Sequence, residues 1–249
     1  QRSYPWINRI HAYPHTTVRL IFQRVVHWRG EPRPRESQTF VWQQPGCLTV
    51  SPMLPANAPI LKALQLPSVY AITDATEIGV AESLRRLERA LARGLRLVQV
   101  REKAMDAHQR SGFAHEVHAR CRDHSALVLI NSDISLAQKL QVSGVHLTAQ
   151  QLMSIGAKPQ FEWCAASCHD DMELARAAQL GVDFVVLGPV LATPSHADTS
   201  CLGWQRFSQL ASDSGLPVFA LGGLRRADLE LAWTSGAHGV AMVRGAWEN

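Results

Sequence analysis

Three polar side chains alternate through the stretch LVQVREK, which spans Leu97 to Lys103. Gln99, Arg101 and Lys103 occupy every second position, and in an extended chain alternate side chains share one face of the sheet. Two of the three carry positive charge, and cations at the end of a buried strand are costly unless an anion meets them. The stretch therefore predicts an anion site, unless acidic neighbours such as Asp74 pair with these cations.

Two glycine-containing turns could hold a second anion. Gly222 and Gly223 follow the strand-like PVFAL, and Arg244 and Gly245 follow HGVAMV. Glycine lets backbone N–H groups approach an oxyanion, and a following helix adds a favourable dipole. A lone pair of glycines is also common in ordinary turns. Together with the cations, the turns predict a site for two phosphorylated molecules.

The elements that would position these residues alternate along the chain after residue 66. Eight short apolar runs read as strands: VYAIT, RLVQV, LVLIN, GVHL, EWCAAS, DFVVLG, PVFAL and HGVAMV. Helical stretches lie between most of them, such as IGVAESLRRLERALARG, with Leu84, Leu87, Ala90 and Leu91 on one face. This alternation predicts an α/β fold with a closed (β/α)8 TIM barrel, and a doubly wound sheet is the alternative.

A barrel would bring the carboxyl ends of its strands to one mouth, where barrel enzymes carry their sites. The polar and glycine residues at these predicted ends are Asp74, Arg101, Asn131, His146, Ser167, Gly188, Gly222 and Arg244. Their clustering favours the barrel over the doubly wound sheet.

Composition indicates a folded protein of 249 residues, of which 46% are hydrophobic. No apolar run approaches the ~18 residues that cross a bilayer, and no signal peptide is legible. The chain begins without Met, which suggests a fragment or a processed product. Its five cysteines lack CxxC spacing, so we expect neither disulfides nor a zinc site. We also expect a cytoplasmic location, with no membrane partner and no specific nucleic-acid partner.

Residues 1–65 differ from the rest in charge and pattern. Through Leu66, eight Lys and Arg face two Glu, a net charge of +6, whereas the remainder carries 17 against 19, a net charge of −2. The runs TTVRLIFQRVVHW and QTFVWQQ read as strands on either side of the turn-rich RGEPRPRES, and SPMLPANAPILKAL closes with a short helix begun at a proline. We expect an antiparallel pair plus a helix, which forms a poor independent core.

From Leu66 to about Trp247 the chain resembles the thiamine phosphate synthase and TenI family. The matching motifs occur in family order: VYAITD, LVQVREK, LVLINSD, SGVHLTAQQL, CAASCHD, DFVVLGPVLATPSHAD and PVFALGGL. The resemblance implies a TIM barrel over residues 66–249 that binds a pyrimidine methyl diphosphate and a thiazole phosphate.

The resemblance also assigns roles to residues. It implies diphosphate binding by Gln99, Arg101 and Lys103; substrate contacts from Asn131, Gly188, Thr193 and His196; phosphate binding by Gly222, Gly223, Arg244 and Gly245; and catalytic roles for Ser167 and His169. His169 matches the histidine that moves a proton in the TenI branch. An exposed residue at a helix start beside a capping Asp170 is the alternative for His169. We expect Cys164 and Cys168 to be buried small side chains.

Departures from the synthase pattern affect the metal. A full synthase would use Mg2+ held by two Asp side chains, but Ser132 and Gln151 stand at those positions, and Asp133 could substitute only if its loop shifts. Ser195 and His196 replace an expected Thr and Lys. The resemblance therefore implies either a weakened synthase or a metal-independent, TenI-like thiazole isomerase.

Residues 1–65 resemble the C-terminal half of a MutT-type Nudix hydrolase, an 8-oxo-dGTP diphosphatase. The resemblance implies that Asn57 contacts a guanine base and that Glu36 helps to hold Mg2+, but no G-x5-E-x7-R-E-x-x-E-E stretch occurs. An alternative function follows, in which the barrel is a non-catalytic accessory or ligand-sensing module of a hydrolase whose Nudix box lies upstream. Purine nucleotides and a second copy of the chain are then further candidate partners.

Overall fold

The computed structural model describes residues 2–193 and 200–247. Eight parallel strands close into a barrel, each hydrogen-bonded to the next, with the last pairing to the first. They are β3 (Val69–Ile72), β4 (Leu97–Val100), β5 (Leu127–Asn131), β6 (Gly144–Leu147), β7 (Trp163–Cys168), β8 (Phe184–Leu187), β9 (Val218–Leu221) and β10 (Gly239–Met242). The predicted TIM barrel is confirmed, and every run predicted as a barrel strand forms one.

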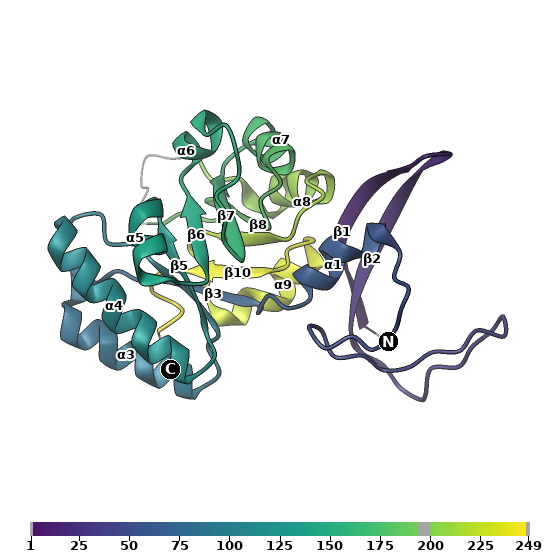
Figure 1. Cartoon of the computed structure of the whole chain (residues 1–249), viewed down its shortest axis with the longest axis horizontal. Coiled ribbons are helices and arrows are strands. Elements are labelled where there is room, and N and C mark those ends of the chain that lie inside the picture. Colours follow the sequence, from purple (N-terminus) through teal and green to yellow (C-terminus); the bar gives the residue numbers. More distant parts are fainter. Residues whose placement is uncertain (1, 194–199, 248–249) are drawn as a thin grey trace.

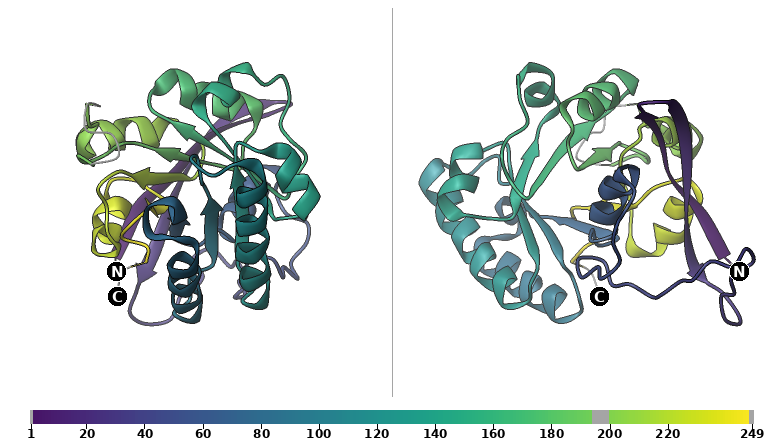
Figure 2. Two further views of the ribbon diagram at one scale, coloured as in Figure 1. Left: turned by 90° about the vertical axis from the view of Figure 1, so that its left-hand side faces the viewer. Right: turned by 45° about the vertical axis from the view of Figure 1, so that its right-hand side comes forward.

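Helices surround the barrel on its outside (Figures 1 and 2). They are α2 (Ala75–Ile78), α3 (Val80–Ala92), α4 (Ala107–Asp123), α5 (Ile134–Leu140), α6 (Ala149–Ser154), α7 (Asp171–Leu180), α8 (Gly203–Asp213) and α9 (Leu229–Thr234), with a short 3-10 turn at Arg226–Asp228. One apolar core fills the space between the helices and the sheet, and a second fills the barrel interior. Because alternate residues of a strand face these two cores, β4 sends Val98 and Val100 outward and Leu97 inward.

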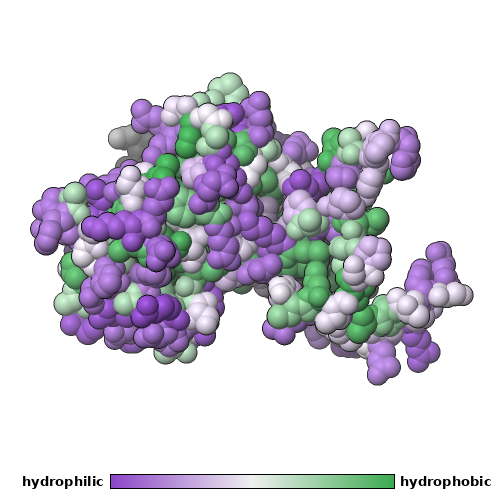
Figure 3. Space-filling model, in the orientation of Figure 1, coloured by the Kyte–Doolittle hydropathy of each residue, from purple (hydrophilic) through white to green (hydrophobic). Residues whose placement is uncertain are grey.

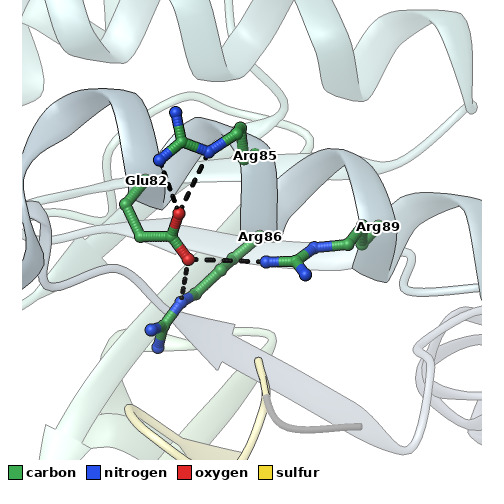
Figure 4. Close-up of polar contacts among 4 residues, drawn as sticks. All are labelled: Glu82, Arg85, Arg86 and Arg89. Carbon is green, nitrogen blue, oxygen red and sulfur yellow. Dashed lines mark hydrogen bonds and ion pairs between the residues drawn. The ribbon is translucent and has the colours of Figure 1, made fainter.

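The helix α3 shows how amphipathic pattern sets orientation. Leu87, Ala90 and Leu91 are buried against the sheet, as the 3.6-residue period predicts. On the solvent side Glu82 accepts hydrogen bonds from three arginines one or two turns further along (Figure 4). These bonds, that from Arg86 first, hold the pKa of Glu82 below its usual value. Such exposed pairs keep the helix surface polar and stabilise the fold little.

Residues before the barrel form a long antiparallel hairpin, β1 (Arg2–Tyr13) and β2 (Thr16–His27), followed by a loop, a 3-10 turn at Pro55–Asn57 and helix α1 (Ala58–Ala63). The strand expected within TTVRLIFQRVVHW and the short helix are confirmed. The strand expected at QTFVWQQ is wrong: its only pairing among the described residues is an isolated bridge between Gln44 and Cys47. Instead β2 pairs with β1, in a two-stranded sheet.

The hairpin stands beside the barrel and is joined to it by a buried cluster (Figure 1). The indole N–H of Trp6 donates to Nδ1 of His238 at 3.1 Å, and Nε2 of His238 lies 3.0 Å from the carbonyl oxygen of Leu66. Arg24 donates to the carbonyl oxygen of His238 at 2.8 Å and lies over the rings of Trp6 and Trp233. Burial, together with the Arg24 charge, lowers the pKa of His238 to about 3, so this histidine is neutral.

Much of the remaining hairpin and loop surface is apolar (Figure 3). Phe40, Val41 and Trp42 are 53%, 62% and 70% exposed. Among the residues described, no helix is long and apolar enough to span a membrane.

Candidate functional site at the barrel mouth

A chain of four polar side chains runs through the barrel interior towards its carboxyl end. The amide of Gln99 donates to the phenol oxygen of Tyr70 at 3.0 Å. The phenol oxygen lies 3.2 Å from Nδ1 of His146, and Nε2 of His146 lies 2.9 Å from Oγ of Ser167. Gln99, Tyr70 and His146 are buried, whereas Ser167 is partly exposed. The chain therefore connects the inner core to the mouth.

The hydrogen bonds around His146 favour one position for its proton, and the tautomer is assigned from that network. Burial, with a smaller effect of the Arg101 charge, lowers the pKa of His146 to about 3, so the ring is neutral and carries one N–H. Because the phenol oxygen of Tyr70 already accepts from Gln99, its own hydrogen is available for Nδ1 of His146. The ring N–H is then on Nε2 and donates to Ser167. The hydroxyl hydrogen of Ser167 is left to donate to a bound molecule.

Arg101 and Lys103 follow β4 in the first turn of the loop, where the chain leaves the sheet. The backbone N–H of Arg101 donates to Oγ1 of Thr73 at 3.0 Å. Neither cation forms an ion pair with any residue in the described part of the chain. The charge of Arg101, followed by burial, lowers the pKa of Lys103, which shows that two positive charges lie close together.

The acidic residues beside these cations do not neutralise them. Glu102 is buried and accepts hydrogen bonds from the backbone N–H groups of Ala75 and Thr76 at 2.9 and 3.1 Å and from the Thr76 hydroxyl at 3.0 Å. Burial raises the pKa of Asp74, and the Arg101 charge opposes that rise without forming an ion pair. The expected alternative, in which nearby acids pair with Arg101 and Lys103, is therefore wrong for the described residues.

A pocket of about 550 Å³ opens beside this loop. It lies between the loops after β4 and β5 and the helices α4 to α6. Its lining includes Glu102, Lys103, Arg110, Asn131, Ser132, Asp133 and Gln151. The structure thus brings Lys103 and Asn131 into one cavity with Ser132 and Gln151. These last two stand where a metal-binding synthase is expected to have Asp.

The pocket does not fit a Mg2+ ion. Gln151 donates its side-chain amide to the carbonyl oxygen of Ser132 at 2.8 Å, so both neutral residues are bound to each other. Asp133 accepts from the backbone N–H of Leu136 at 2.9 Å, which caps α5, and its other oxygen lies 3.6 Å from Nη2 of Arg110. No group of three or more metal-binding side chains occurs in residues 2–193 or 200–247. Hard divalent cations prefer several anionic oxygens, and the two carboxylates of the pocket are already engaged, Asp133 by Leu136 and Glu102 by Ala75 and Thr76.

The glycines at the other side of the mouth allow three loops to pack closely. A Cβ on Gly188 would lie 2.3 Å from the carbonyl oxygen of Leu221. Gly222 and Gly223 have φ of +111° and +66°, and a Cβ on them would lie 2.7 Å from Pro189 Cβ and Ala192 O respectively. A Cβ on Gly245 would lie 2.9 Å from the Leu224 carbonyl oxygen. The loops after β8, β9 and β10 therefore pack closely against one another at this side of the mouth.

Other predicted residues lie apart from the polar chain. His169 is exposed, and its Nδ1 lies 2.9 Å from Oε2 of Glu173 one turn into α7. Asp170 caps α7 by accepting from the N–H of Glu173 at 2.9 Å, as expected. Arg244 is exposed after β10, Thr193 is partly buried after β8, and Ser195 and His196 fall outside the described residues.

The remaining predicted residues are placed as follows. Cys164 and Cys168 are buried as expected, and burial raises the pKa of both thiols, that of Cys164 to about 12. Glu36 is exposed in the loop after the hairpin, with its backbone N–H bound to Gln38. Asn57 contacts Met53 next to α1. Within the described residues no hydrogen bond or ion pair joins Glu36 to Asn57.

Sequence reasoning did not assign roles to Tyr70, Glu102, His146 or Arg110. Tyr70 and His146 both lie on inward-facing strand positions among apolar residues, which was the one available signal. Arg110 lies in the first turn of α4, where the helix dipole disfavours a positive charge. This unfavourable position is the one feature of the sequence that could have drawn attention to Arg110.

Comparisons with known proteins agree with this geometry. The profile of the thiamine monophosphate synthase family matches residues 69–246. The chain is 33% identical over 183 residues to a putative thiamine-phosphate synthase 2 of Aquifex aeolicus, covering 72% of this chain and 97% of that protein. It is 30% identical over 187 residues to the thiamine-phosphate synthase of Thioalkalivibrio sulfidiphilus, covering 74% of this chain and 89% of that protein.

A solved structure shares the fold. The thiamine phosphate pyrophosphorylase from Pyrococcus furiosus superposes with a TM-score of 0.60 at 19% identity, over 72% of this chain and 90% of that one. With a parallel barrel, a cationic loop after β4 and a family profile that matches residues 69–246, the chain belongs to the thiamine monophosphate synthase family.

Proposed function

We propose that the barrel binds a pyrimidine diphosphate and a thiazole phosphate at its mouth and condenses them slowly to thiamine phosphate. The observation that carries this proposal is the pair Arg101 and Lys103, two cations that form no ion pair with a described acid, beside a pocket lined by Lys103 and Asn131. Uncompensated cations at a partly buried site are costly unless an anion binds there.

Each side of the mouth would serve one substrate. Arg101 and Lys103 hold the diphosphate as charge-assisted hydrogen-bond donors, and Asn131 contacts the pyrimidine. The Gly222–Gly223 turn, with Gly188 and Gly245, exposes backbone N–H groups to the thiazole phosphate. Thr193 and Arg244 complete that side. Ser167, oriented by His146, donates a hydrogen bond between the two substrates.

In this reaction the ring nitrogen of the thiazole bonds to the pyrimidine methylene carbon while the carbon–oxygen bond to the diphosphate breaks. The departing diphosphate takes the bonding electron pair, and its growing negative charge is stabilised by Arg101 and Lys103. Preorganised cations in a partly buried site act more strongly than in water.

Phosphorus NMR tests the proposal. The whole chain is incubated with the two substrates, and formation of pyrophosphate and thiamine phosphate is followed. We expect turnover that falls about tenfold or more in Arg101→Gln, because a charge-assisted bond to the leaving group is lost. Arg122→Gln, an exposed change at the end of α4, is the matched control and should leave the rate unchanged. Absence of binding and turnover with either substrate would contradict the proposal.

The missing metal ligands favour a second candidate, a ligand-binding barrel with little or no catalysis. Ser132 and Gln151 bind each other rather than a cation, so departure of the diphosphate lacks one source of assistance. Saturable binding of both substrates without product would support this candidate. Turnover of a thiazole carboxylate phosphate that Mg2+ does not change, and that His169→Asn abolishes, would instead support a TenI-like isomerase.

For residues 1–65 we propose the C-terminal part of a Nudix-type domain, with Asn57 as its base contact. An antiparallel hairpin, the turn before α1, and an exposed apolar surface on the hairpin and loop support this proposal. Calorimetry with a purine nucleoside triphosphate tests it. We expect weak binding that Asn57→Ala removes, and no hydrolysis, since the sequence holds no Nudix box.

A further inference from the structure

We propose that Arg110 supplies the positive charge that holds the diphosphate, in the place where a Mg2+ ion would act in a synthase, so that this barrel binds diphosphate without metal. The inference rests on the proposed function and specifies how the diphosphate side of the mouth works. It assigns a binding role to a residue outside the motifs quoted above.

The position of Arg110 in the pocket supports this role. Arg110 lies in the first turn of α4, and its guanidinium lines the same pocket as Lys103, Asn131 and Ser132. Its Nη1 donates to the carbonyl oxygen of Met105 at 3.1 Å, which anchors one edge of the group. A planar guanidinium offers two donors side by side to one phosphate group, which suits bidentate binding.

Much of the donor capacity of Arg110 is unused. Its Nε is buried and has no hydrogen-bond partner in the described residues. Its Nη2 lies 3.6 Å from Oδ2 of Asp133, a distance that permits attraction but not a hydrogen bond. A buried donor without a partner is costly. Because Nε is closed to solvent, an additional ligand would be met by Nη2, on a side chain that is 27% exposed.

The acids of the pocket are already occupied. Oδ1 of Asp133 accepts from the N–H of Leu136 and so caps α5, while Glu102 accepts three hydrogen bonds from Ala75 and Thr76. Lys103 forms no ion pair within the described residues, and Arg110 is met only by the Met105 carbonyl oxygen and, at 3.6 Å, by Asp133. An incoming diphosphate therefore meets two cations whose charge is only partly balanced.

Ser132 and Gln151 leave the pocket without two negative charges that a metal-binding synthase would have there. With Asp at positions 132 and 151, two more negative charges would stand in the pocket, and a divalent cation would be needed between them and a diphosphate. With Ser132 and Gln151 there is no such repulsion, and the amide of Gln151 is bound to the Ser132 carbonyl. The neutral residues at positions 132 and 151 thus remove repulsion of the diphosphate, and Arg110 supplies positive charge in the same pocket.

Calorimetry with inorganic pyrophosphate tests the inference. The whole chain is titrated once with EDTA present and once with excess Mg2+. We expect binding in EDTA, with Arg110→Gln weakening it about tenfold or more, since one charge-assisted interaction is lost. Arg110→Lys should recover part of the affinity, and Arg122→Gln on the same helix should bind as the unaltered chain does. Thermal unfolding of each variant checks that it is folded.

A gain of metal dependence gives a second test that leaves Arg110 in place. In the double variant Ser132→Asp, Gln151→Asp, we expect pyrophosphate affinity in EDTA to fall at least tenfold and Mg2+ to restore it. Pyrophosphate binding by the unaltered chain only with Mg2+, or equal affinity of Arg110→Gln in EDTA, would overturn the inference while leaving the proposed function intact. No pyrophosphate binding under either condition would overturn both.

Discussion

At the scale of single residues, the phenol of Tyr70 is the central member of the polar chain inside the barrel. Its oxygen accepts from Gln99 and lies next to Nδ1 of His146, so its loss leaves two buried polar groups without a partner. We expect Tyr70→Phe to lower the free energy of unfolding by about 1–3 kcal/mol in urea denaturation. Tyr13→Phe, on the hairpin, is the control and should change it by less than about 0.5 kcal/mol.

The same variant tests the proton position on His146. Without the Tyr70 hydroxyl, nothing in the polar chain holds the ring N–H on Nε2, and Ser167 loses its fixed orientation. Substrate affinity at the mouth should therefore weaken together with stability. Unchanged stability in Tyr70→Phe would contradict the hydrogen-bonded chain itself.

The two neutral buried histidines predict how stability depends on pH. Burial lowers the pKa of His146 and His238 to about 3, below the ordinary value of 6.5. Between these values the unfolded chain binds more protons than the folded one, so stability falls as pH decreases from 6.5 towards 3. Each histidine should lower the free energy of unfolding by about 2 kcal/mol when the pH falls from 7 to 5.

Urea denaturation at pH 7 and pH 5 measures this dependence. In His146→Gln the loss between the two pH values should be smaller by about 2 kcal/mol, since glutamine does not titrate. His27→Gln, at the exposed end of β2, should leave the loss unchanged. An equal loss in His146→Gln and the unaltered chain would show that His146 is not the titrating group.

At the scale of elements, the close packing of the loops after β8 and β9 requires Gly222. A Cβ there would meet Pro189 at 2.7 Å, and the residue has φ of +111°. Gly236 also has positive φ, +85°, but a Cβ there would meet nothing within 4 Å. We expect Gly236→Ala to cost about 1–2 kcal/mol from backbone strain, and Gly222→Ala to cost about 1–3 kcal/mol more from the clash.

The affinity for inorganic phosphate should also differ between Gly222→Ala and Gly236→Ala. Because Gly222→Ala displaces the loop that we assign to the thiazole phosphate, phosphate affinity should fall in that variant. Gly236→Ala, which lies away from the mouth in the turn before β10, should bind phosphate normally. Equal destabilisation of the two variants would mean that the loops do not depend on this contact.

The barrel strands could be predicted from the sequence because strands buried on both sides are continuous apolar runs between polar helices. The hairpin could not be predicted correctly. β1 contains Pro5, and its register with β2 shifts between Pro5 and Asn8, which hides the strand pattern. The apolar run Phe40 to Trp42 looks like a strand, but it forms no ladder with another strand of the described structure.

Only those parts of the candidate site whose residues are close together in the sequence could be predicted. Gln99, Arg101 and Lys103 are neighbours in sequence, and their alternation predicts an anion site, although Gln99 itself is buried and donates to Tyr70. By contrast, His146 meets Tyr70 from 76 residues away and Ser167 from 21 residues away, and those contacts exist only once the barrel closes. Similarly, the meeting of Arg110 with Asp133 depends on how α4 packs beside β5.

At the scale of the whole molecule, Trp6 ties the hairpin to the base of the barrel. It is buried, donates to His238 and lies under Arg24. We expect Trp6→Ala to destabilise the protein by about 3–5 kcal/mol and to make the hairpin sensitive to limited proteolysis. Trp42→Ala, at an exposed tryptophan, should change stability by less than about 0.5 kcal/mol. Equal effects of the two changes would show that the hairpin and barrel are independent.

Binding of a diphosphate at the barrel mouth depends, in our proposal, on Arg101 and Lys103. Calorimetric titration of the whole chain with pyrophosphate, beside the double variant Arg101→Gln, Lys103→Gln, measures this dependence. We expect saturable binding of one pyrophosphate per chain, weakened about a hundredfold in the double variant as two charge-assisted contacts are lost. Binding of equal strength in both proteins, or none in the unaltered chain, would contradict this proposal.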